Sequence, residues 1–156
     1  MSIIAKLVSS DRIRLDTLLN FYPIYFFSGV KIKISNNCKQ ITIKVPLRWY
    51  TKNNSGVMFG GLICLASDPF PSIVFQRLIP GSRAWSAMHK VDYLKPSTTQ
   101  IVAKIQISDA EITDLTNQLE QSGKARRDFE YYFYDIYNRQ IARITSTTYL
   151  KKSNNN

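Results

Sequence analysis

The sequence has few of the residues that build metal centres and disulfide frameworks: one histidine, His89, and two cysteines, Cys38 and Cys64, among 156 residues. No group of Cys and His has the spacing of metal ligands, so no metal site is expected. Cys38 falls in an expected turn and Cys64 in an expected buried helix, which favours reduced thiols. A reduced, cytoplasmic protein is therefore expected.

Long apolar runs are also missing. The stretch from Phe21 to Phe27 comes closest, but it is short and contains Pro23, whereas a membrane-spanning helix needs about 20 apolar residues. No transmembrane helix is expected, and nothing at the N-terminus has the pattern of a signal peptide. With 44% apolar residues, 9 Tyr and 8 Phe, the chain is expected to form one globular domain over residues 1–156.

Acidic residues are scarce, 11 against 21 Lys and Arg, which gives a formal net charge of +10. This charge favours anionic partners such as nucleic acid, an anionic membrane surface or a phosphate-bearing cofactor. The basic residues form no single run, and no DNA-reading motif accompanies them, so nucleic acid is the least favoured partner. A solvated sheet face that aids solubility is the simpler interpretation.

Alternating apolar and polar residues, together with turn residues, predict the secondary structure. The expected elements, in chain order, are a helix over 11–22 with Asp11 as its N-cap, strands over 30–34 and 41–45, a helix from about 60 to 67, a second helical piece ending before Pro80, strands over 85–94 and 100–107, a helix over 108–123, and strands over 129–136 and 140–150. Ser108 and Glu111 have capping-box spacing. Residues 153–156 are expected to be a frayed tail. This order predicts an antiparallel sheet wrapped around one apolar helix, an α+β arrangement.

The segment from Asn53 to Asp68 combines turn formers, a Gly60-Gly61 pair, an apolar run and a carboxylate. A helix that begins near Gly60 presents unpaired backbone N–H groups to a negative charge or a polarisable carbonyl. Asp68 follows about two helical turns later, where an acid could act on whatever binds there. This segment is the candidate functional site.

The same segment resembles the motif of the PaaI-like thioesterases, Asn-x-x-Gly-x-x-His-Gly-Gly followed by an acid seven residues later. The matching positions are Asn53, Gly56, Gly60, Gly61 and Asp68. Phe59 stands at the position of the histidine. Because a phenyl ring cannot polarise a carbonyl, Phe59 fits the core or the lining of an acyl pocket.

The chain is more similar to an uncharacterised hotdog family that is often labelled thioesterase-like. The shared features are Phe59-Gly60-Gly61, Asp68-Pro69-Phe70, Trp85 before the third strand, and Leu94-Lys95-Pro96 at the end of that strand. The resemblance runs from about residue 28 to residue 152 and implies the hotdog fold, in which a curved antiparallel sheet wraps a long helix. It is more specific for the fold than for the reaction.

The resemblance implies hydrolysis of an acyl-CoA or a related thioester, with coenzyme A as part of the substrate and no cofactor. The N–H groups of Gly60 or Gly61 would polarise the carbonyl, and Asp68 would activate water or attack as the nucleophile. Asn53 would orient the water or the carbonyl. The residues that would line the substrate pocket are Gly56, Met58 and Phe59. A homodimer or a dimer of dimers is also implied, with the site between two protomers.

Each site residue also has a structural interpretation. Asp68 precedes a proline at the start of an apolar run, which is typical of a helix N-cap. Gly60 and Gly61 would also permit close packing, and Asn53 is common in turns. The alternative function is a non-catalytic acyl- or lipid-binding protein of the same fold, with Phe59 lining an apolar pocket.

Two further expectations concern polar residues outside the motif. His89 is expected at the surface or in an interface, and a lone histidine there does not fit a hydratase or dehydratase of this fold. Five basic residues are candidates to meet coenzyme A phosphates, although an ordinary surface charge is the simpler interpretation of each: Arg83, Lys95, Lys124, Arg126 and Arg127.

Overall fold

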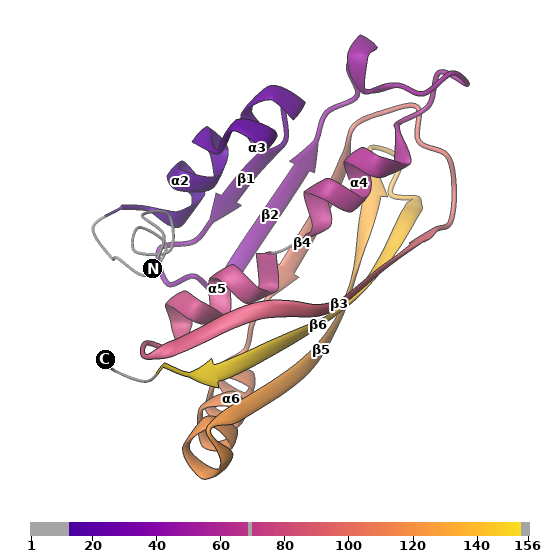
Figure 1. Cartoon of the computed structure of the whole chain (residues 1–156). Helices are drawn as coiled ribbons and strands as arrows, with labels where there is room; N and C mark the ends of the chain where they lie inside the picture. The colour runs from indigo at the N-terminus through magenta and orange to yellow at the C-terminus, as the bar shows by residue number, and fades with distance from the viewer. Residues whose placement is uncertain (1–12, 69, 154–156) are drawn as a thin grey trace.

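A computed structural model describes residues 13–68 and 70–153 of the chain. One six-stranded sheet curves around a set of helices (Figure 1). The strands are β1 (Lys31–Ile34), β2 (Gln40–Val45), β3 (Ser82–Tyr93), β4 (Ile101–Gln106), β5 (Lys124–Asp135) and β6 (Gln140–Lys152). The helices are α2 (Leu15–Phe21), α3 (Pro23–Ser28), α4 (Gly60–Ser67), α5 (Phe70–Leu78) and α6 (Asp109–Ser122), with a 3-10 helix η1 (Trp49–Thr51) before α4.

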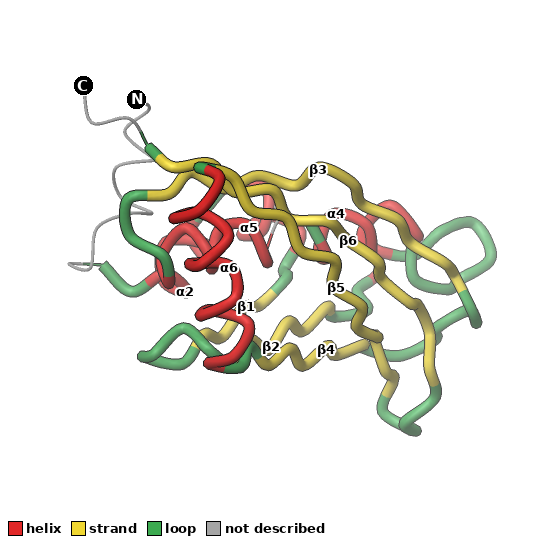
Figure 2. The backbone as a smooth tube through the Cα atoms, turned by 90° about the horizontal axis from the view of Figure 1, so that it is seen from below, coloured by secondary structure: helices red, strands yellow, loops and turns green. Residues whose placement is uncertain are grey.

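The strands are ordered β1-β2-β4-β5-β6-β3, and every neighbouring pair is antiparallel. The sheet curves so that β1, β2 and β4 face β5, β6 and β3, with α4 and α5 between the two halves (Figure 2). The edges of the sheet are β1, with 4 residues, and β3, with 12 residues. The long edge therefore lies beside the central helices, where the candidate site is expected.

The core lies between the concave face of the sheet and the helices. In β1 and β2 every second side chain is buried, as in Ile32, Ile41 and Ile43, because successive residues of a strand face opposite sides. From the helical side, Phe75 of α5 is fully buried, and its ring centroid lies 5.1 Å from that of Phe129 in β5. The predicted α+β arrangement is confirmed.

The expected N-terminal helix over 11–22 is wrong in its extent. Helix α2 begins at Leu15, and Asp11, the expected N-cap, lies outside the described residues. Pro23 does not follow the end of the helical region but occupies the first turn of a second helix, α3. The extended backbone of Tyr22, with φ −64° and ψ 126°, separates the two helices, as expected for a residue that precedes a proline.

The two local predictions for α6 are confirmed, whereas the start of β5 and the place of Ser153 differ from the predictions. The side chain of Ser108 accepts a hydrogen bond from the backbone N–H of Glu111, and the Glu111 carboxylate accepts one from the Ser108 N–H, so the capping box forms. Gly123 ends α6 in the left-handed conformation, with φ 71°. Strand β5 begins earlier than expected, at Lys124 instead of 129. Ser153, expected in the frayed tail, donates its N–H to the carbonyl of Gly81.

Candidate active site

Helix α4 and the edge strand β3 lie against each other and hold the candidate site between them. Gly60 is the first residue of α4, and Asp68 is its C-cap in the extended conformation, with φ −101° and ψ 142°. The Tyr93 hydroxyl of β3 donates a hydrogen bond of 2.9 Å to the Gly60 carbonyl. At the other end of α4, the Ser86 hydroxyl donates one of 2.9 Å to Asp68 Oδ1. The strand therefore runs antiparallel to the helix and contacts both of its ends.

Asp68 follows the last turn of α4. Its backbone N–H donates to the Cys64 carbonyl at 3.2 Å, and its side chain is half-buried. Within residues 13–68 and 70–153, the carboxylate accepts a hydrogen bond from Ser86 and none from the backbone of α5. The side chain is thus directed to β3 and is not occupied as an N-cap of α5 by any described residue.

A chain of hydroxyl groups continues from Ser86 into the protein. Ser72 Oγ of α5 lies 3.3 Å from Ser86 Oγ and 3.4 Å from Thr148 Oγ1 of β6. Ser72 and Thr148 are both buried. This chain orients the Ser86 hydroxyl toward Asp68, and sequence reasoning missed all three residues because single Ser and Thr residues carry no motif.

Two tyrosines fix the C-terminal end of α4. Tyr131 donates its hydroxyl to the Ser67 carbonyl at 2.7 Å, and Tyr25 donates to the Asp68 carbonyl at 2.9 Å. Burial, and then the negative charge of Asp68, raises the pKa of both phenols. Both hydroxyls therefore stay protonated and keep donating to the carbonyls that end the helix.

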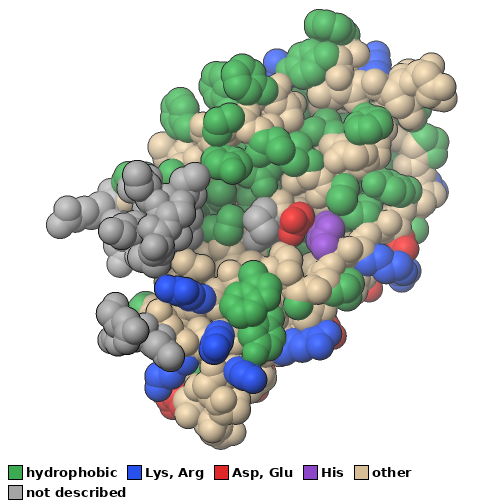
Figure 3. All heavy atoms as spheres, viewed as in Figure 1, with side chains coloured by type: hydrophobic (Ala, Val, Ile, Leu, Met, Phe, Trp, Pro, Cys, Tyr) green, Lys and Arg blue, Asp and Glu red, His purple; other side chains and the backbone are tan. Residues whose placement is uncertain are grey.

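His89 is not simply a surface residue, as the sequence suggests. Its Nε2 lies 2.9 Å from Ser67 Oγ, and its Nδ1 is buried without a hydrogen-bond partner in the described part of the chain. Burial lowers the pKa of His89, and the charge of Asp68 acts in the opposite direction. Figure 3 shows a histidine beside an acidic side chain on this face. The imidazole is accordingly neutral near pH 7, close to the carboxylate.

The N-terminus of α4 lacks a side-chain cap. Phe59 is the N-cap residue, and its ring accepts no hydrogen bond from the helix. A Cβ atom at Gly60 would lie 3.2 Å from the ring of Tyr93, and one at Gly61 would clash with Phe59 Cε1. Both glycines therefore permit close approach of an aromatic ring, and their first-turn N–H groups form no hydrogen bond to another described element.

The side-chain oxygen of Asn53 maintains a local turn. It accepts hydrogen bonds from the N–H groups of Ser55, at 2.9 Å, and Val57, at 3.2 Å. Gly56 completes the turn with φ 76° and is exposed, and no heavy atom lies within 4 Å of the place that a Cβ would occupy. The turn interpretation of Asn53 thus holds for its oxygen, while its amide nitrogen forms no hydrogen bond to a described residue.

Two cavities flank the start of α4. One, of about 550 Å³, is lined by Phe27, Ser28, Tyr50, Thr51, Lys52, Phe59, Gly61, Leu62 and Leu65. The other, of about 330 Å³, is lined by Asn53, Met58, Gly60, Ile63, Tyr93, Leu94, Lys95, Pro96 and Ser97. The predicted pocket residues Phe59 and Met58 therefore lie on different sides of the helix. Aromatic and aliphatic side chains line both cavities, but the first has the rings of Phe27, Tyr50 and Phe59, whereas the second has only that of Tyr93.

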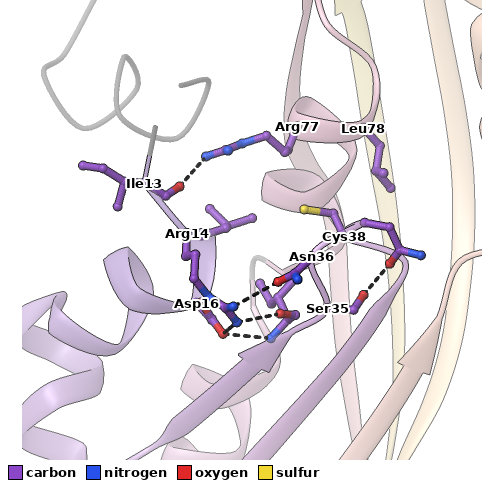
Figure 4. A pocket seen from close by; sticks show the side chains of 11 residues that line it. Ile13, Arg14, Asp16, Ser35, Asn36, Cys38, Arg77 and Leu78 are labelled. Atoms are coloured by element: carbon purple, nitrogen blue, oxygen red, sulfur yellow. Dashed lines mark hydrogen bonds and ion pairs between the residues drawn. The ribbon is translucent and has the colours of Figure 1, made fainter. Parts of the chain in front are cut away.

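A third cavity, of about 470 Å³, lies where α2, the β1–β2 turn and α5 meet (Figure 4). Arg14 donates to Asp16 Oδ1 at 3.1 Å and to Asn36 Oδ1 at 2.9 Å. Arg77 donates to the Ile13 carbonyl at 3.4 Å. Because these polar groups bind one another, we do not place the candidate site in this cavity.

The two ends of α4 are too far apart to act on one carbonyl within a single protomer. Asp68 is eight positions after Gly60, so at 1.5 Å per residue their Cα atoms lie about 12 Å apart along the helix axis. A substrate oxygen bound at the Gly60 N–H is out of reach of the Asp68 carboxylate, which must lie within hydrogen-bond distance of the attacking water. The sequence places both residues in one motif, but the structure does not bring them together.

Among the described residues, no group of three or more His, Cys, Asp and Glu side chains could hold a metal ion. No helix in residues 13–68 and 70–153 is long and apolar enough to cross a membrane.

Solved structures share this fold over nearly their whole length. The Pseudomonas aeruginosa protein of unknown function PA5026 matches with a TM-score of 0.78 and 14% identity, covering 97% of this chain and 98% of that one. The thioesterase HI1161 from Haemophilus influenzae matches with a TM-score of 0.65 and 12% identity, covering 92% and 95%. The PaaI protein of the Escherichia coli phenylacetic acid degradation operon matches with 0.62 and 11%, covering 88% and 89%.

The protein has the hotdog fold, and the predicted resemblance to thioesterase-like hotdog proteins is confirmed. Residues 15–150 match the family described as a domain of unknown function, DUF4442. The chain belongs to this family. No curated protein matches it significantly.

Proposed function

We propose that the protein hydrolyses an acyl thioester of coenzyme A in a site shared by two protomers. The observation that carries the proposal is the pairing of α4 with β3, which holds the Asp68 carboxylate against Ser86 at one end and leaves the Gly60 N–H uncapped at the other. An acid and an oxyanion donor are two of the groups that acyl transfer to water requires.

In a dimer, a second copy of the chain would bring an Asp68 carboxylate close to the Gly60 N–H of the first. The edge strand β3 pairs with β6 on one side and with no strand of the described residues on the other. Among those residues, only its Ala84 N–H has a side-chain partner, Gln76 Oε1 at 3.4 Å, and antiparallel pairing with β3 of another copy would satisfy the remaining edge groups. A two-fold axis through that pairing sets the two α4 helices side by side in opposite directions. The Gly60 end of one helix then approaches the Asp68 end of the other, which resolves the separation of about 12 Å.

The proposed reaction follows from these positions. The thioester oxygen accepts a hydrogen bond from Gly60 N–H of one protomer, and Asp68 of the other removes a proton from water. The water oxygen bonds to the carbonyl carbon, and charge develops on the oxygen beside the helix N-terminus. The C–S bond then breaks, the thiolate takes the proton that Asp68 removed from water, and a free acid and a thiol leave. Ser86 holds one Asp68 oxygen and leaves the other for the water.

The acyl chain fits the first of the two cavities beside α4. Its lining includes the aromatic rings of Phe27, Tyr50 and Phe59 and the aliphatic side chains of Leu62 and Leu65. Burial of each CH₂ group of the chain contributes about 0.8 kcal/mol to binding. The volume of about 550 Å³ accommodates a chain of several carbons.

The test is thiol release from short-, medium- and long-chain acyl-CoA, measured with a thiol-reactive dye. Asp68→Asn keeps an acceptor for Ser86 but cannot take the proton, so activity should fall at least 100-fold, in line with general-base effects of roughly 10² to 10⁴. Asp114→Asn, an exposed acid of α6, is the matched control and should retain full activity. Equal activity in Asp68→Asn, with its fold verified by circular dichroism, would exclude the assignment.

A second candidate function is non-catalytic binding of acyl chains. Phe59 favours it, because this ring lines the apolar cavity where PaaI-like thioesterases have histidine. Binding of a fluorescent acyl probe without turnover of any acyl-CoA chain length would support this function and contradict the hydrolase.

A further inference from the structure

The outer, convex face of the β5–β6–β3 half of the sheet carries four basic and two aromatic side chains in two rows. The first row is Arg83, Lys151 and Lys124, and the second is Trp85, Tyr149 and Arg126, as the strand pairing shows. These six residues are called the basic aromatic face below. Figure 3 shows hydrophobic side chains bordered by several Lys and Arg side chains in the region of β3 and β6.

The six side chains are close together. Residues opposite each other on neighbouring antiparallel strands have Cα atoms about 4.5 to 5.5 Å apart, and the two rows are about 7 Å apart along the strands. The rings of Trp85 and Tyr149 contact each other, with centroids 4.7 Å apart and planes at 45°. Trp85 is 46% exposed. The rings therefore form an accessible platform directly beside the cations.

The four cations have no anionic partner within the described part of the chain. Basic residues nearby do have one: Arg127 pairs with Glu111, and Arg143 pairs with Asp92. Like charges directly opposite each other in a sheet destabilise it by roughly 0.2 to 1 kcal/mol per pair. A bound polyanion would remove this repulsion, whereas a simple solubility function would favour separated charges.

The neighbouring acid does not neutralise the cluster. Asp128 lies in the next row of the same face, and its Oδ1 accepts a hydrogen bond of 2.6 Å from Thr147 Oγ1. The carboxylate is thus held within its own row.

Two recognition chemistries coincide on this face. Aromatic rings stack on nucleobases and contribute about 1 to 3 kcal/mol per base. Guanidinium and ammonium groups bind phosphate oxygens. We propose that the basic aromatic face binds a nucleotide that carries two or more phosphate groups, with the base stacked on Trp85 and Tyr149 and the phosphates held by the four cations. Such a ligand is either a free coenzyme or single-stranded nucleic acid.

The site is independent of thioester hydrolysis. Trp85 points to the convex face, whereas its neighbour Ser86 points to the concave side and contacts Asp68. Loss of nucleotide binding therefore leaves the Asp68 chemistry intact, and an inactive Asp68→Asn variant should bind nucleotides as well as the wild type. The two proposals can fail separately.

The experiment follows Trp85 fluorescence in a Trp49→Phe background, since Trp49 is the other tryptophan of the chain. The probes are adenosine 3′,5′-bisphosphate, inorganic pyrophosphate, a 12-nucleotide single-stranded oligonucleotide, and vesicles that contain anionic lipid. We expect quenching by the bisphosphate or the oligonucleotide at micromolar concentrations. For the oligonucleotide, four contacts predict that the logarithm of the affinity falls with the logarithm of the salt concentration with a slope of about −3.

Matched variants separate this face from the general charge of the protein. Lys124→Gln with Lys151→Gln removes two charges from the basic aromatic face and should weaken binding at least tenfold. Lys33→Gln with Lys104→Gln removes two exposed charges from the other half of the sheet and should leave it unchanged. The affinities of Trp85→Phe and Trp85→Ala for a labelled nucleotide are compared by titration. Trp85→Phe should bind more tightly, because its ring can still stack on the base.

Each result has a defined meaning. If only the bisphosphate binds, the natural ligand is a free coenzyme. If only the oligonucleotide binds, the natural ligand is single-stranded nucleic acid. Either result supports a nucleotide site on this face. Pyrophosphate binding as tight as that of the bisphosphate, with no effect of Trp85→Ala, contradicts base stacking. No binding of either nucleotide probe, binding of vesicles only, or equal weakening by the two double variants overturns the proposal.

Discussion

A proline at the first position of α4 would remove one candidate oxyanion donor without breaking the helix. Gly60 is the first helical residue, and proline is well tolerated there because the N–H of that position has no intrahelical partner. Phe59 has φ −66° and ψ 124°, the extended conformation that a residue before proline requires. Gly60→Pro therefore deletes the N–H and keeps the backbone path.

The matched control is Gly60→Ala. Either substitution places a Cβ 3.2 Å from the Tyr93 ring, a contact that a small movement of this partly exposed ring relieves. Alanine keeps the N–H. The difference between the two variants thus isolates the donor, and loss of one oxyanion donor lowers kcat by roughly 10² to 10³, equivalent to about 2.7 to 4 kcal/mol.

The assay is the steady-state rate of thiol release with the best acyl-CoA substrate, after thermal melts have shown that both variants are folded. We expect Gly60→Ala to lose less than tenfold in kcat, and Gly60→Pro to lose about 100-fold or more with a smaller change in KM. Equal kcat values for the two folded variants would refute the assignment of the Gly60 N–H as oxyanion donor.

Three further predictions concern pH, a helix cap and the acyl cavity. Folding lowers the pKa of His89, so the imidazole of the unfolded chain is protonated at a higher pH than that of the folded chain. The contribution of His89 to the free energy of unfolding is therefore fully present above about pH 6.5 and declines as the pH falls through that value. Urea unfolding at several pH values should show a shallower decline for His89→Gln than for the wild type. Ser108→Ala removes the cap of α6 and should lower the free energy of unfolding by about 0.5 to 2 kcal/mol, whereas no change would contradict the observed capping box. Leu65→Trp fills part of the cavity beside α4 and should raise KM for long-chain acyl-CoA more than for short-chain acyl-CoA; an equal effect on both would place the acyl chain elsewhere.

Local sequence signals predicted many of the strands and helix ends, because interactions between residues close together in the sequence determine where these elements begin and end. Strict alternation gave β1 and β2, since only one face of these strands meets the core. The capping box at Ser108 marked the start of α6, and the glycine pair marked the start of α4. The beginning of β5 was missed because Lys124 and Arg126 lie on the convex, solvent face, and a charged segment without strong apolar alternation does not read as a strand.

The site was less predictable because its partners come from distant parts of the chain. Asp68 was identified from its motif, but the Ser86 hydroxyl contacts it, and the His89 imidazole contacts the adjacent Ser67, only because α4 packs on the edge strand β3. No local pattern specifies such a contact. The separation of about 12 Å between Gly60 and Asp68 likewise follows from the helical rise, and it is the reason why the proposed site draws one residue from each of two chains.

The central claim, a site assembled from two protomers, is tested most directly by complementation between two inactive variants. Asp68→Asn and Gly60→Pro, carrying different affinity tags, are co-expressed and the mixed dimers are purified. In a mixed dimer one site combines the intact Asp68 of one chain with the intact Gly60 of the other, so about half of the wild-type activity should return. Mixed dimers as inactive as both parent variants would contradict the shared site.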